Sequence, residues 1–299
     1  MPAYIVTGPT SGMGRYAALE LAKHGTVILV GRDRAKLAQV QKTVRQKGRE
    51  AVSVVCDLSD IVSVRRAAAE IIALNLPIAG LLNNAGIRQS IPTKSAQGWD
   101  LSFATNHLGP FALTEALMPH LPDGANILFV ASATEDPQRQ PAARFGFRGG
   151  RYISAEASAR GEWKPGGSEK PGFDSYATSK QLAIVTAFEF ARENPRLDIN
   201  AIEPGLMPTT GLGKETPFFA RMMMHVLVPL MVPFIKVLST PQRAARVLTT
   251  ILTDTSAKSG IYFDESGRPM TQSSAEVCDP AFTARVVAET RALLSTVPA

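Results

Sequence analysis

The stretch Ile5-Val6-Thr7-Gly8-Pro9-Thr10-Ser11-Gly12-Met13-Gly14 joins an apolar run to the first helical pattern of this chain. Glycine permits backbone angles that other residues avoid, and it lets a phosphate approach the amides at a helix N-terminus, where the helix dipole favours negative charge. The stretch therefore predicts a strand, a phosphate-binding turn and a helix, with the pyrophosphate of a dinucleotide as ligand. A tight strand-to-helix turn without a ligand would need the same glycines and is the alternative.

The same alternation of apolar runs and helical patterns continues along the chain. The apolar runs are nearly continuous in Val, Ile, Leu and Ala, which is typical of strands buried on both faces of a parallel sheet. They predict strands at Ala3–Thr7, Thr26–Val30, Ala51–Val55, Ile78–Leu82, Asn126–Ala131, Asp198–Ile202 and Gly260–Phe263. Helical patterns lie between them at Gly12–His24, Asp33–Lys47, Asp60–Leu74, Gln97–His120, Ser175–Arg192 and Thr240–Thr253. We expect an α/β fold of the Rossmann type, with a doubly wound, seven-stranded parallel sheet, helices on both faces and one catalytic domain over residues 1–299.

Two stretches interrupt this alternation, each just after the carboxyl end of a predicted strand, where ligands bind in open α/β sheets. Residues 134–173 are rich in Gly, Pro, Arg and Ser and predict a long loop insertion. Residues 205–238 are dense in Met, Phe, Leu and Pro and predict an apolar substrate lid. For residues 218–238 a core helix and a peripheral segment in contact with a membrane stay open as alternatives. The 14 uncharged residues between Arg221 and Lys236 are too few to span a bilayer, so we expect no transmembrane anchor.

Composition and charge favour an ordinary globular protein. Of 299 residues, 45% are hydrophobic and 19% are charged, and this composition excludes a largely disordered chain. Two cysteines, Cys56 and Cys278, and an N-terminus without a leader pattern favour a cytoplasmic setting. The net charge is +6, and basic residues gather between Arg32 and Arg49 at helical spacing; we interpret them as a solvated helix face rather than a nucleic-acid surface. The four histidines lack metal-ligand spacing, so no metal site is expected.

The end of the second predicted strand, Val30-Gly31-Arg32-Asp33, bears on the choice of dinucleotide. NAD sites place a carboxylate here for the ribose 2′-hydroxyl, whereas NADP sites place a cation for the 2′-phosphate. Gly31 stands where that acid is expected, Arg32 follows it, and Asp33 is interpreted as a helix N-cap. We therefore predict NADP(H) in preference to NAD(H), with a solvated Arg32 as the alternative.

Asp174-Ser175-Tyr176-Ala177-Thr178-Ser179-Lys180 places a tyrosine and a lysine four apart on one helical face. A free tyrosine titrates near pH 10, so it needs stabilisation of its phenolate to act near neutral pH. One ammonium group about 5 Å away supplies about 3 kcal/mol at an effective dielectric constant of 20. The positive charge of Lys180 thus has the sign needed to lower the pKa of Tyr176, and its interaction energy is large enough.

Four further motifs occur in order with this pair: the glycine-rich stretch, Asn83-Asn84-Ala85-Gly86 after the fourth strand, Asn106 in the next helix, and Ser132 at the end of the fifth strand. Together they resemble the short-chain dehydrogenase/reductase superfamily across essentially the whole chain. The long gap between Ser132 and Tyr176, the apolar segment after Pro204-Gly205, and the tail at residues 259–264 resemble its retinol dehydrogenase-like and protochlorophyllide reductase-like branch.

The resemblance implies a role for each matching residue. Tyr176 would donate and accept the proton, Lys180 would bind the nicotinamide ribose and lower the pKa of Tyr176, and Ser132 would hydrogen-bond the substrate oxygen. Asn106 would hold a water that links Lys180 to solvent. The cofactor would be bound by Gly8, Thr10, Ser11, Gly12, Met13, Gly14, Arg32, Asp57, Asn84, Tyr176, Lys180, Pro204, Gly205 and Thr209. The structural alternatives are that Asn84 only ties strands together and that Asp57 caps the following helix.

We therefore expect an NADP(H)-dependent oxidoreductase, such as a carbonyl reductase, that moves a hydride between the nicotinamide and a carbonyl or alcohol carbon of a bulky apolar small molecule. Two alternatives stay open: reduction of a conjugated carbon–carbon double bond, and a redox-sensing regulator that binds NADP(H) without turnover. The resemblance also implies a homo-oligomer, and no nucleic-acid partner is expected.

Overall fold

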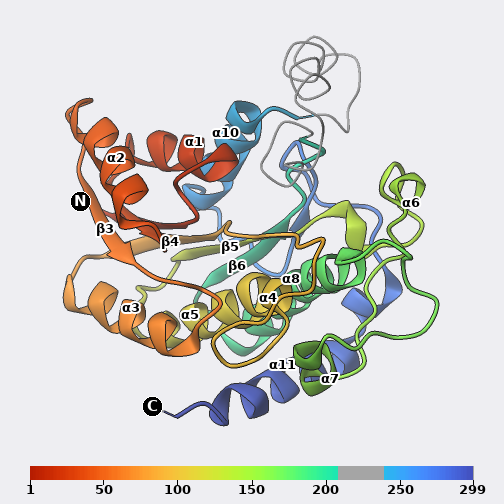
Figure 1. Ribbon diagram of the computed structural model, residues 1–299. Coiled ribbons are helices and arrows are strands. Elements are labelled where there is room, and N and C mark those ends of the chain that lie inside the picture. The colour runs from red at the N-terminus through yellow and green to blue at the C-terminus, as the bar shows by residue number, and fades with distance from the viewer. Residues whose placement is uncertain (208–238, 299) are drawn as a thin grey trace, which may run out of the picture.

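The chain folds around one parallel sheet of seven strands in the order β3-β2-β1-β4-β5-β6-β7 (Figure 1). The structure, a computed structural model, describes residues 1–207 and 239–298. The strands are β1 (Ala3–Thr7), β2 (Thr26–Gly31), β3 (Ala51–Val55), β4 (Ile78–Asn83), β5 (Asn126–Val130), β6 (Asp198–Ile202) and β7 (Tyr262–Phe263). The predicted α/β class and seven-stranded parallel sheet are confirmed, with strand ends within two residues of those expected.

Successive residues of each strand enter two different cores. In β1, Ala3 and Ile5 pack into one hydrophobic cluster, and Tyr4 and Val6 pack into the other, because side chains alternate between the faces of a strand. The first cluster is covered by α3 (Ile61–Ala73), α5 (Gly109–Leu117) and α8 (Phe173–Glu193), and the second by α1 (Gly12–Leu21), α2 (Arg34–Arg45) and α10 (Pro241–Leu252). Figure 1 shows these two helical layers on opposite sides of the sheet.

The order of the strands places the site. From β1 the chain builds outward to β2 and β3 on one side, and then returns to place β4 on the other side of β1. The carboxyl ends of β1 and β4 therefore flank the point where the winding reverses, and ligands bind there in open α/β sheets. The glycine-rich turn follows β1, and Asn84 follows β4, so the topology brings them together.

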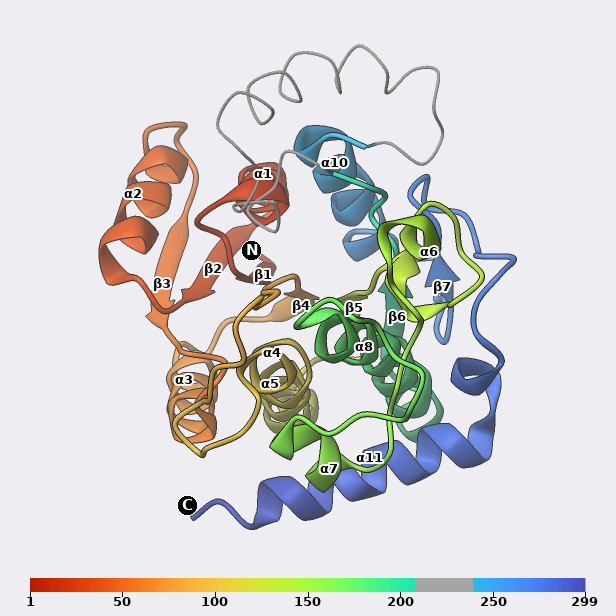
Figure 2. The same ribbon diagram turned by 45° about the vertical axis from the view of Figure 1, so that its right-hand side comes forward.

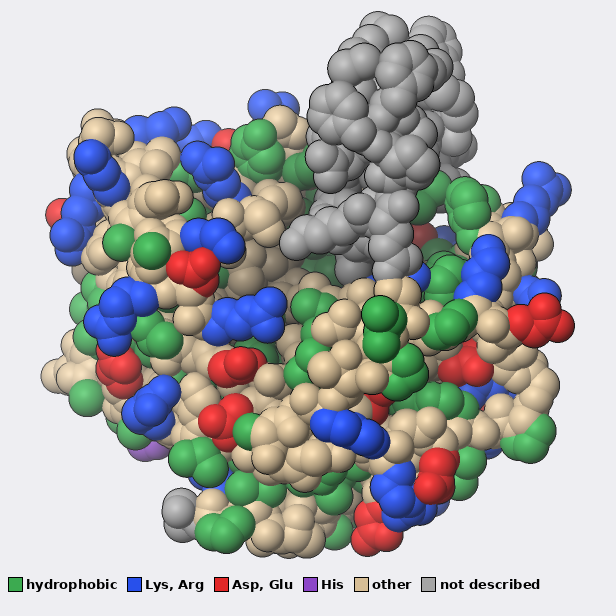
Figure 3. Space-filling model, in the orientation of Figure 1, with side chains coloured by type: hydrophobic (Ala, Val, Ile, Leu, Met, Phe, Trp, Pro, Cys, Tyr) green, Lys and Arg blue, Asp and Glu red, His purple; other side chains and the backbone are tan. Residues whose placement is uncertain are grey.

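The basic segment after β2 forms the outer face of α2. Its apolar residues Leu37, Val40 and Val44 are buried, whereas its arginines and lysines face outward. Figure 3 shows Lys and Arg side chains gathered over this part of the surface. The helix begins at Asp33, whose carboxylate accepts a hydrogen bond from the Lys36 amide at 3.0 Å, so the predicted N-cap is confirmed.

The structure describes one of the two predicted insertions and leaves most of the other outside its described residues. Residues 134–173, predicted as a long loop insertion, contain two short helices that were not predicted, α6 (Ala142–Phe145) and α7 (Ala155–Arg160). Helices of four and six residues are too short to show a sequence period, which explains the miss. The predicted lid falls mainly at 208–238, outside the described residues. No helix in the described ranges is long and apolar enough to cross a membrane.

The predicted helix at Gln97–His120 is not continuous. It divides into α4 (Leu101–Phe103), a π-helical turn at Ala104–Leu108, α5 and a final 3₁₀ turn at Met118–His120. A π turn widens the helix by one residue and is frequent at functional sites. The turn contains Asn106.

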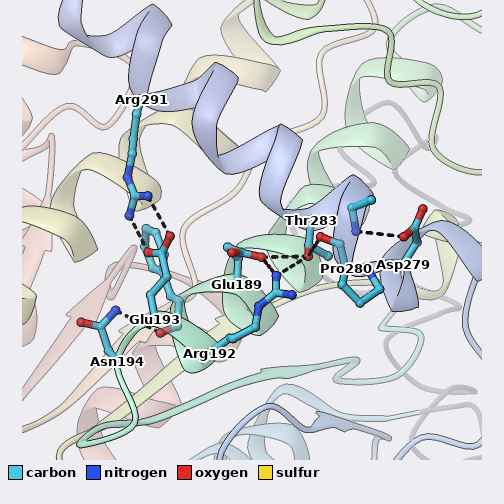
Figure 4. Close-up of polar contacts among 10 residues, drawn as sticks. Glu189, Arg192, Glu193, Asn194, Asp279, Pro280, Thr283 and Arg291 are labelled. Atoms are coloured by element: carbon cyan, nitrogen blue, oxygen red, sulfur yellow. Dashed lines mark hydrogen bonds and ion pairs between the residues drawn. The ribbon is translucent and has the colours of Figure 1, made fainter.

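The sequence analysis missed the last helix, α11 (Pro280–Ser295), which packs across α8 (Figure 2). Phe282, Val286 and Leu293 are among its buried residues. Arg291 pairs with Glu193 of α8 at 2.6 Å, and Arg192 of α8 contacts Thr283 at 2.9 Å (Figure 4). The signal was present, because Asp279-Pro280 is a helix start followed by apolar residues at helical spacing.

Candidate active site

The glycine-rich turn between β1 and α1 forms a close-fitting cradle. Gly8 and Gly12 have positive φ angles of 66° and 51°, and the Gly8 amide donates to the Val30 carbonyl at 2.9 Å. A Cβ atom on Gly14 would overlap the Gly8 carbonyl oxygen, so only glycine fits there. The α1 N-terminus therefore lies directly against the turn, and Ser11 at its N-cap makes no side-chain capping bond. A turn with this geometry suits a pyrophosphate, which would be held by backbone amides and the helix dipole.

Thr7 and Asn84 join the turn to the end of β4. The Asn84 side-chain amide donates to the Thr7 carbonyl at 2.8 Å, and the Thr7 hydroxyl accepts from the amides of Asn84 and Ala85. Asn84 thus ties the two strands together, as its structural alternative proposed, at the point where the predicted cofactor would lie. Thr7 therefore positions Asn84, and it was not among the site residues predicted from the sequence.

Three other predicted cofactor residues, Met13, Thr10 and Arg32, lie in or beside this turn and differ in their burial. Met13 is buried in the core, so only its backbone faces the turn. Thr10 is half-buried. Arg32 is exposed directly after Gly31, the last residue of β2, and a Cβ atom on Gly31 would lie 3.7 Å from Pro9 of the turn. The structure therefore places Arg32 beside the cradle.

Asp57 follows β3 and does not cap the next helix. Its carboxylate accepts from the Ser59 amide at 2.9 Å and from the Ser59 hydroxyl at 2.7 Å. Asp60 is the N-cap of α3, so the capping alternative for Asp57 was wrong.

Ser132, Tyr176 and Lys180 converge beyond the carboxyl end of β5. Tyr176 and Lys180 lie one turn apart on α8, both buried, and the Lys180 Nζ atom lies 5.7 Å from the centre of the Tyr176 ring. The Lys180 ammonium donates to the Val130 carbonyl, the last residue of β5, at 2.7 Å. The Ser132 side chain acts on the Tyr176 phenol and lowers its pKa. The helical spacing and the strand end thus bring together the three predicted catalytic side chains.

The electrostatics of this group differ from the expectation in one respect. Burial raises the pKa of Tyr176 to about 12, although the Ser132 side chain and the positive charge of Arg88 both lower it. Burial also lowers the pKa of Lys180 to about 8. The net direction for Tyr176 is opposite to the predicted depression, because losing water destabilises the phenolate more than the neighbouring groups stabilise it.

Asn106 clamps the loop after β4 to α8. Its carbonyl oxygen accepts from the Ile87 amide at 2.8 Å, and its amide donates to the Ile87 carbonyl at 2.8 Å and to the Ser179 hydroxyl at 3.0 Å. A Cβ atom on Gly86 would lie 3.4 Å from the Lys180 Nζ and 3.5 Å from the Asn106 Oδ1. The Asn106 side chain is thus committed to fixed protein partners close to Lys180.

Pro204 and Gly205 follow β6, and Gly205 has a positive φ angle of 81°. Thr209, predicted to contact the cofactor beside them, lies outside the described residues. Glu203, just before this pair, is buried and bound to Arg139 at 2.6 Å. Arg139 belongs to the 134–173 insertion, so this ion pair joins the insertion to the turn after β6. Neither Glu203 nor Arg139 was among the site residues predicted from the sequence.

Within the described part of the chain, no group of three His, Cys, Asp or Glu side chains is arranged to hold a metal ion.

His107 is buried, and its Nε2 atom lies 3.0 Å from the Thr290 hydroxyl of α11. Burial lowers its pKa to about 3, so it is neutral near pH 7 and joins two helices.

Glu135, three residues after Ser132, predicts a pH dependence of stability. It is buried, accepts from the Ser274 hydroxyl at 2.6 Å, and burial raises its pKa from 4.5 to about 7. The folded state therefore holds this proton more tightly than the unfolded state. The contribution of Glu135 to the free energy of unfolding is fully present below pH 4.5 and is lost as pH rises through about 7, by on the order of 3 kcal/mol. In Glu135→Gln this contribution does not titrate.

Thermal unfolding of wild type and Glu135→Gln at pH 5 and pH 8 checks this prediction. The altered hydrogen bond to Ser274 affects the variant at both pH values, so the change of the Tm difference with pH is the quantity that matters. We expect the Tm of the variant minus the Tm of wild type to be higher at pH 8 than at pH 5. Glu156→Gln, on the exposed side of α7, is the control and should follow wild type. Parallel profiles for Glu135→Gln and wild type would contradict the prediction.

The fold and the order of these residues are those of the short-chain dehydrogenase/reductase class of α/β proteins. The family model described as short chain dehydrogenase matches residues 2–143. A short-chain dehydrogenase/reductase from Armillaria gallica is 32% identical over 239 residues, which cover 75% of this chain and 71% of that protein. The chain therefore belongs to the short-chain dehydrogenase/reductase family, whose members are oxidoreductases.

Similar proteins also include named members of the predicted branch. Protochlorophyllide reductase B of Oryza sativa subsp. japonica is 28% identical over 92% of this chain and 73% of its own length. Retinol dehydrogenase 14 of Mus musculus is 28% identical over 75% of this chain and 66% of its own length. The predicted resemblance to this branch is confirmed. A short chain dehydrogenase from Shigella flexneri 2a, solved with NADP, is 26% identical with a TM-score of 0.62, covering 88% of this chain and 96% of that one.

Proposed function

We propose that this chain is an NADP(H)-dependent oxidoreductase that interconverts a carbonyl compound and its alcohol. The observation that carries the proposal is the convergence of Ser132, Tyr176 and Lys180 beyond β5, next to the glycine cradle after β1. The related Shigella flexneri enzyme binds NADP, which supports the same cofactor here. The predicted cytoplasmic location and homo-oligomeric state stay predictions.

The residues present fit a dinucleotide. A Cβ atom on Gly14 would overlap the Gly8 carbonyl oxygen, so α1 packs closely against the turn, and this supports a pyrophosphate site at the N-terminus of α1. The turn Gly8–Gly14 would hold the pyrophosphate, Arg32 the 2′-phosphate, and Lys180 with Tyr176 the nicotinamide ribose. Asp57 and the Pro204-Gly205 pair would line the adenine and nicotinamide ends. When bound, the nicotinamide supplies or accepts the hydride.

The protein side chains manage the proton. In the direction of reduction, Tyr176 donates its phenolic proton to the substrate oxygen, while the Ser132 hydroxyl hydrogen-bonds to the same oxygen. The buried Lys180 ammonium stabilises the phenolate that remains. Asn106 holds the loop after β4 and α8 in register, so that Lys180 stays near the reacting groups.

The proposal is tested by following the loss of NADPH absorbance with ketones, aldehydes and quinones, and the gain of absorbance from NADP⁺ with apolar alcohols. We expect turnover with at least one class of bulky carbonyl compound, and a product with hydrogen added at the carbonyl carbon and oxygen. Hydrogen added across a carbon–carbon double bond would instead favour the conjugated-alkene alternative. Tight NADPH binding without turnover of any compound would contradict the enzyme and favour the redox-sensing regulator.

A further inference from the structure

The turn after β6 lies next to the reacting groups. The Ala131 amide donates to the Ile202 carbonyl at 2.8 Å, so the end of β6 runs beside the residue that precedes Ser132. Pro204 and Gly205 follow at the carboxyl edge of the sheet, where ligands bind in open α/β folds. The position of this turn therefore bears on the nicotinamide end of the proposed cofactor site.

This turn is held at its start and at its end. The Glu203 amide donates to the Phe263 carbonyl of β7 at 2.9 Å, and the Glu203 carboxylate accepts from the Arg139 guanidinium at 2.6 Å. The Leu206 carbonyl accepts from the Ser239 amide at 3.0 Å. Only 5% of the Glu203 side chain and 18% of the Arg139 side chain are exposed. A largely buried ion pair thus fixes the turn where β6 ends.

The backbone that presents Arg139 is itself fixed. The Asp136 carboxylate accepts from the Gln138 amide at 2.8 Å, and the Asp136 carbonyl accepts from the Arg139 amide at 3.2 Å. The Arg139 carbonyl in turn accepts from the Ala143 amide of α6 at 3.0 Å, and the Arg139 Nη1 atom lies 3.2 Å from the Met270 Sδ. The guanidinium therefore reaches the end of β6 from an ordered turn of the 134–173 insertion.

Arg139 also supplies positive charge to a buried acidic cluster. Glu135 and Glu203 are both buried, and burial raises the pKa of each to about 7, although the charge of Arg139 lowers both. The Tyr262 hydroxyl has no hydrogen-bond partner among the described residues; burial and the two glutamates raise its pKa, and Arg139 lowers it. Without Arg139, the Glu203 carboxylate would be a buried charge that lacks its counter-ion, and it would take up a proton more readily.

We propose that Arg139 is a positioning residue for cofactor binding, whose ion pair with Glu203 holds the turn at Pro204 and Gly205 in the form that receives the nicotinamide end. This inference rests on the proposed function, which places that end of the cofactor beside the turn. It gives the 134–173 insertion a role in binding that acts through the end of β6. A turn released from this ion pair populates other forms, and the affinity for a ligand that needs one form falls in proportion.

The competing explanation is that the ion pair only stabilises the folded insertion. Such a structural role would lower the Tm of a variant and would affect every fragment of the cofactor alike. A positioning role weakens only those ligands that reach the turn. NADPH includes the nicotinamide end, whereas adenosine 2′,5′-bisphosphate has only the adenine and 2′-phosphate end, so these two ligands separate the explanations.

Calorimetric titration of the full chain with NADPH and with adenosine 2′,5′-bisphosphate is the test. We expect Arg139→Gln to raise the Kd for NADPH by about tenfold or more and to leave the Kd for the bisphosphate within about twofold of wild type. Arg139→Lys should recover part of the NADPH affinity, because lysine retains the positive charge beside Glu203. Lys164→Gln is the matched control, since it removes a different ion pair of the same insertion, with Glu276 at 3.0 Å, and should change neither Kd.

Thermal unfolding shows whether each variant keeps its fold. If Arg139→Gln does not fold, Glu203→Gln decides instead, because it removes the charge of the other partner, keeps the size of the side chain and should show the same selective loss of NADPH affinity. An equal change or no change in the two Kd values overturns the proposal, as does the same selective loss in Lys164→Gln. If wild type binds neither ligand, the proposed cofactor fails together with this inference. NADPH binding without turnover contradicts the proposed enzyme alone, and a selective loss in Arg139→Gln then still supports the positioning role.

Discussion

Tyr176→Phe is expected to lower kcat by a factor of about 10²–10⁴, because it removes the proton donor and leaves the ring. Tyr176 is buried beside Lys180, whose Nζ atom lies 5.7 Å from the centre of the Tyr176 ring, so its phenol is the proposed source of the proton. The affinity for NADPH should remain within a few-fold of wild type, since the glycine cradle and Arg32 are unchanged. Steady-state rates with a reducible substrate and a fluorescence titration with NADPH measure the two quantities.

Tyr16→Phe provides the control for this experiment. Tyr16 lies on α1 with 37% of its surface exposed, and it should tolerate the same loss of a hydroxyl without effect on rate. A Tyr176→Phe enzyme with a near-normal kcat would remove Tyr176 from the mechanism. A variant that loses NADPH binding as well would indicate a structural role instead.

Arg32→Ala is expected to reduce the preference for NADPH over NADH by about ten- to a hundredfold, because a guanidinium opposite a dianionic 2′-phosphate forms a charge-assisted pair. The exposed side chain follows Gly31, which packs beside Pro9 of the glycine-rich turn. NADH affinity should change little, since NADH has a hydroxyl in place of that phosphate. Fluorescence titration of wild type and variant with both cofactors gives the four dissociation constants.

Arg34→Ala is the neighbouring control, because Arg34 is also exposed but lies inside α2. It should retain the preference for NADPH. Equal affinities of wild type for NADPH and NADH would rule out the predicted role of Arg32. An equal effect of both substitutions would show that the general positive charge of α2, rather than one guanidinium, selects the cofactor.

Features that depend on neighbours in sequence were predictable. The apolar runs of the strands, the Asp33 N-cap and the one-turn spacing of Tyr176 and Lys180 are local properties, and the structure has each of them. The alternation predicted a doubly wound parallel sheet but not its strand order, because right-handed crossovers are compatible with more than one order. Short elements escaped prediction: α6 and α7 are shorter than the window that a period requires.

Features that depend on burial and on distant partners required the tertiary structure. The direction of the Tyr176 pKa is set by removal of water around the phenol, which no local pattern encodes. The clamp of Asn106 on Ile87 and the approach of Arg88 to Phe173 join segments that are far apart in the chain.

The sequence by itself determined the α/β class, the glycine cradle and the set of candidate catalytic residues, because backbone freedom and helical spacing act over a few residues. Only the tertiary structure decided how burial shifts the pKa values of those residues and which groups position them. Desolvation and electrostatic fields sum over every group packed around a site, and packing brings together groups that the sequence separates by tens of residues.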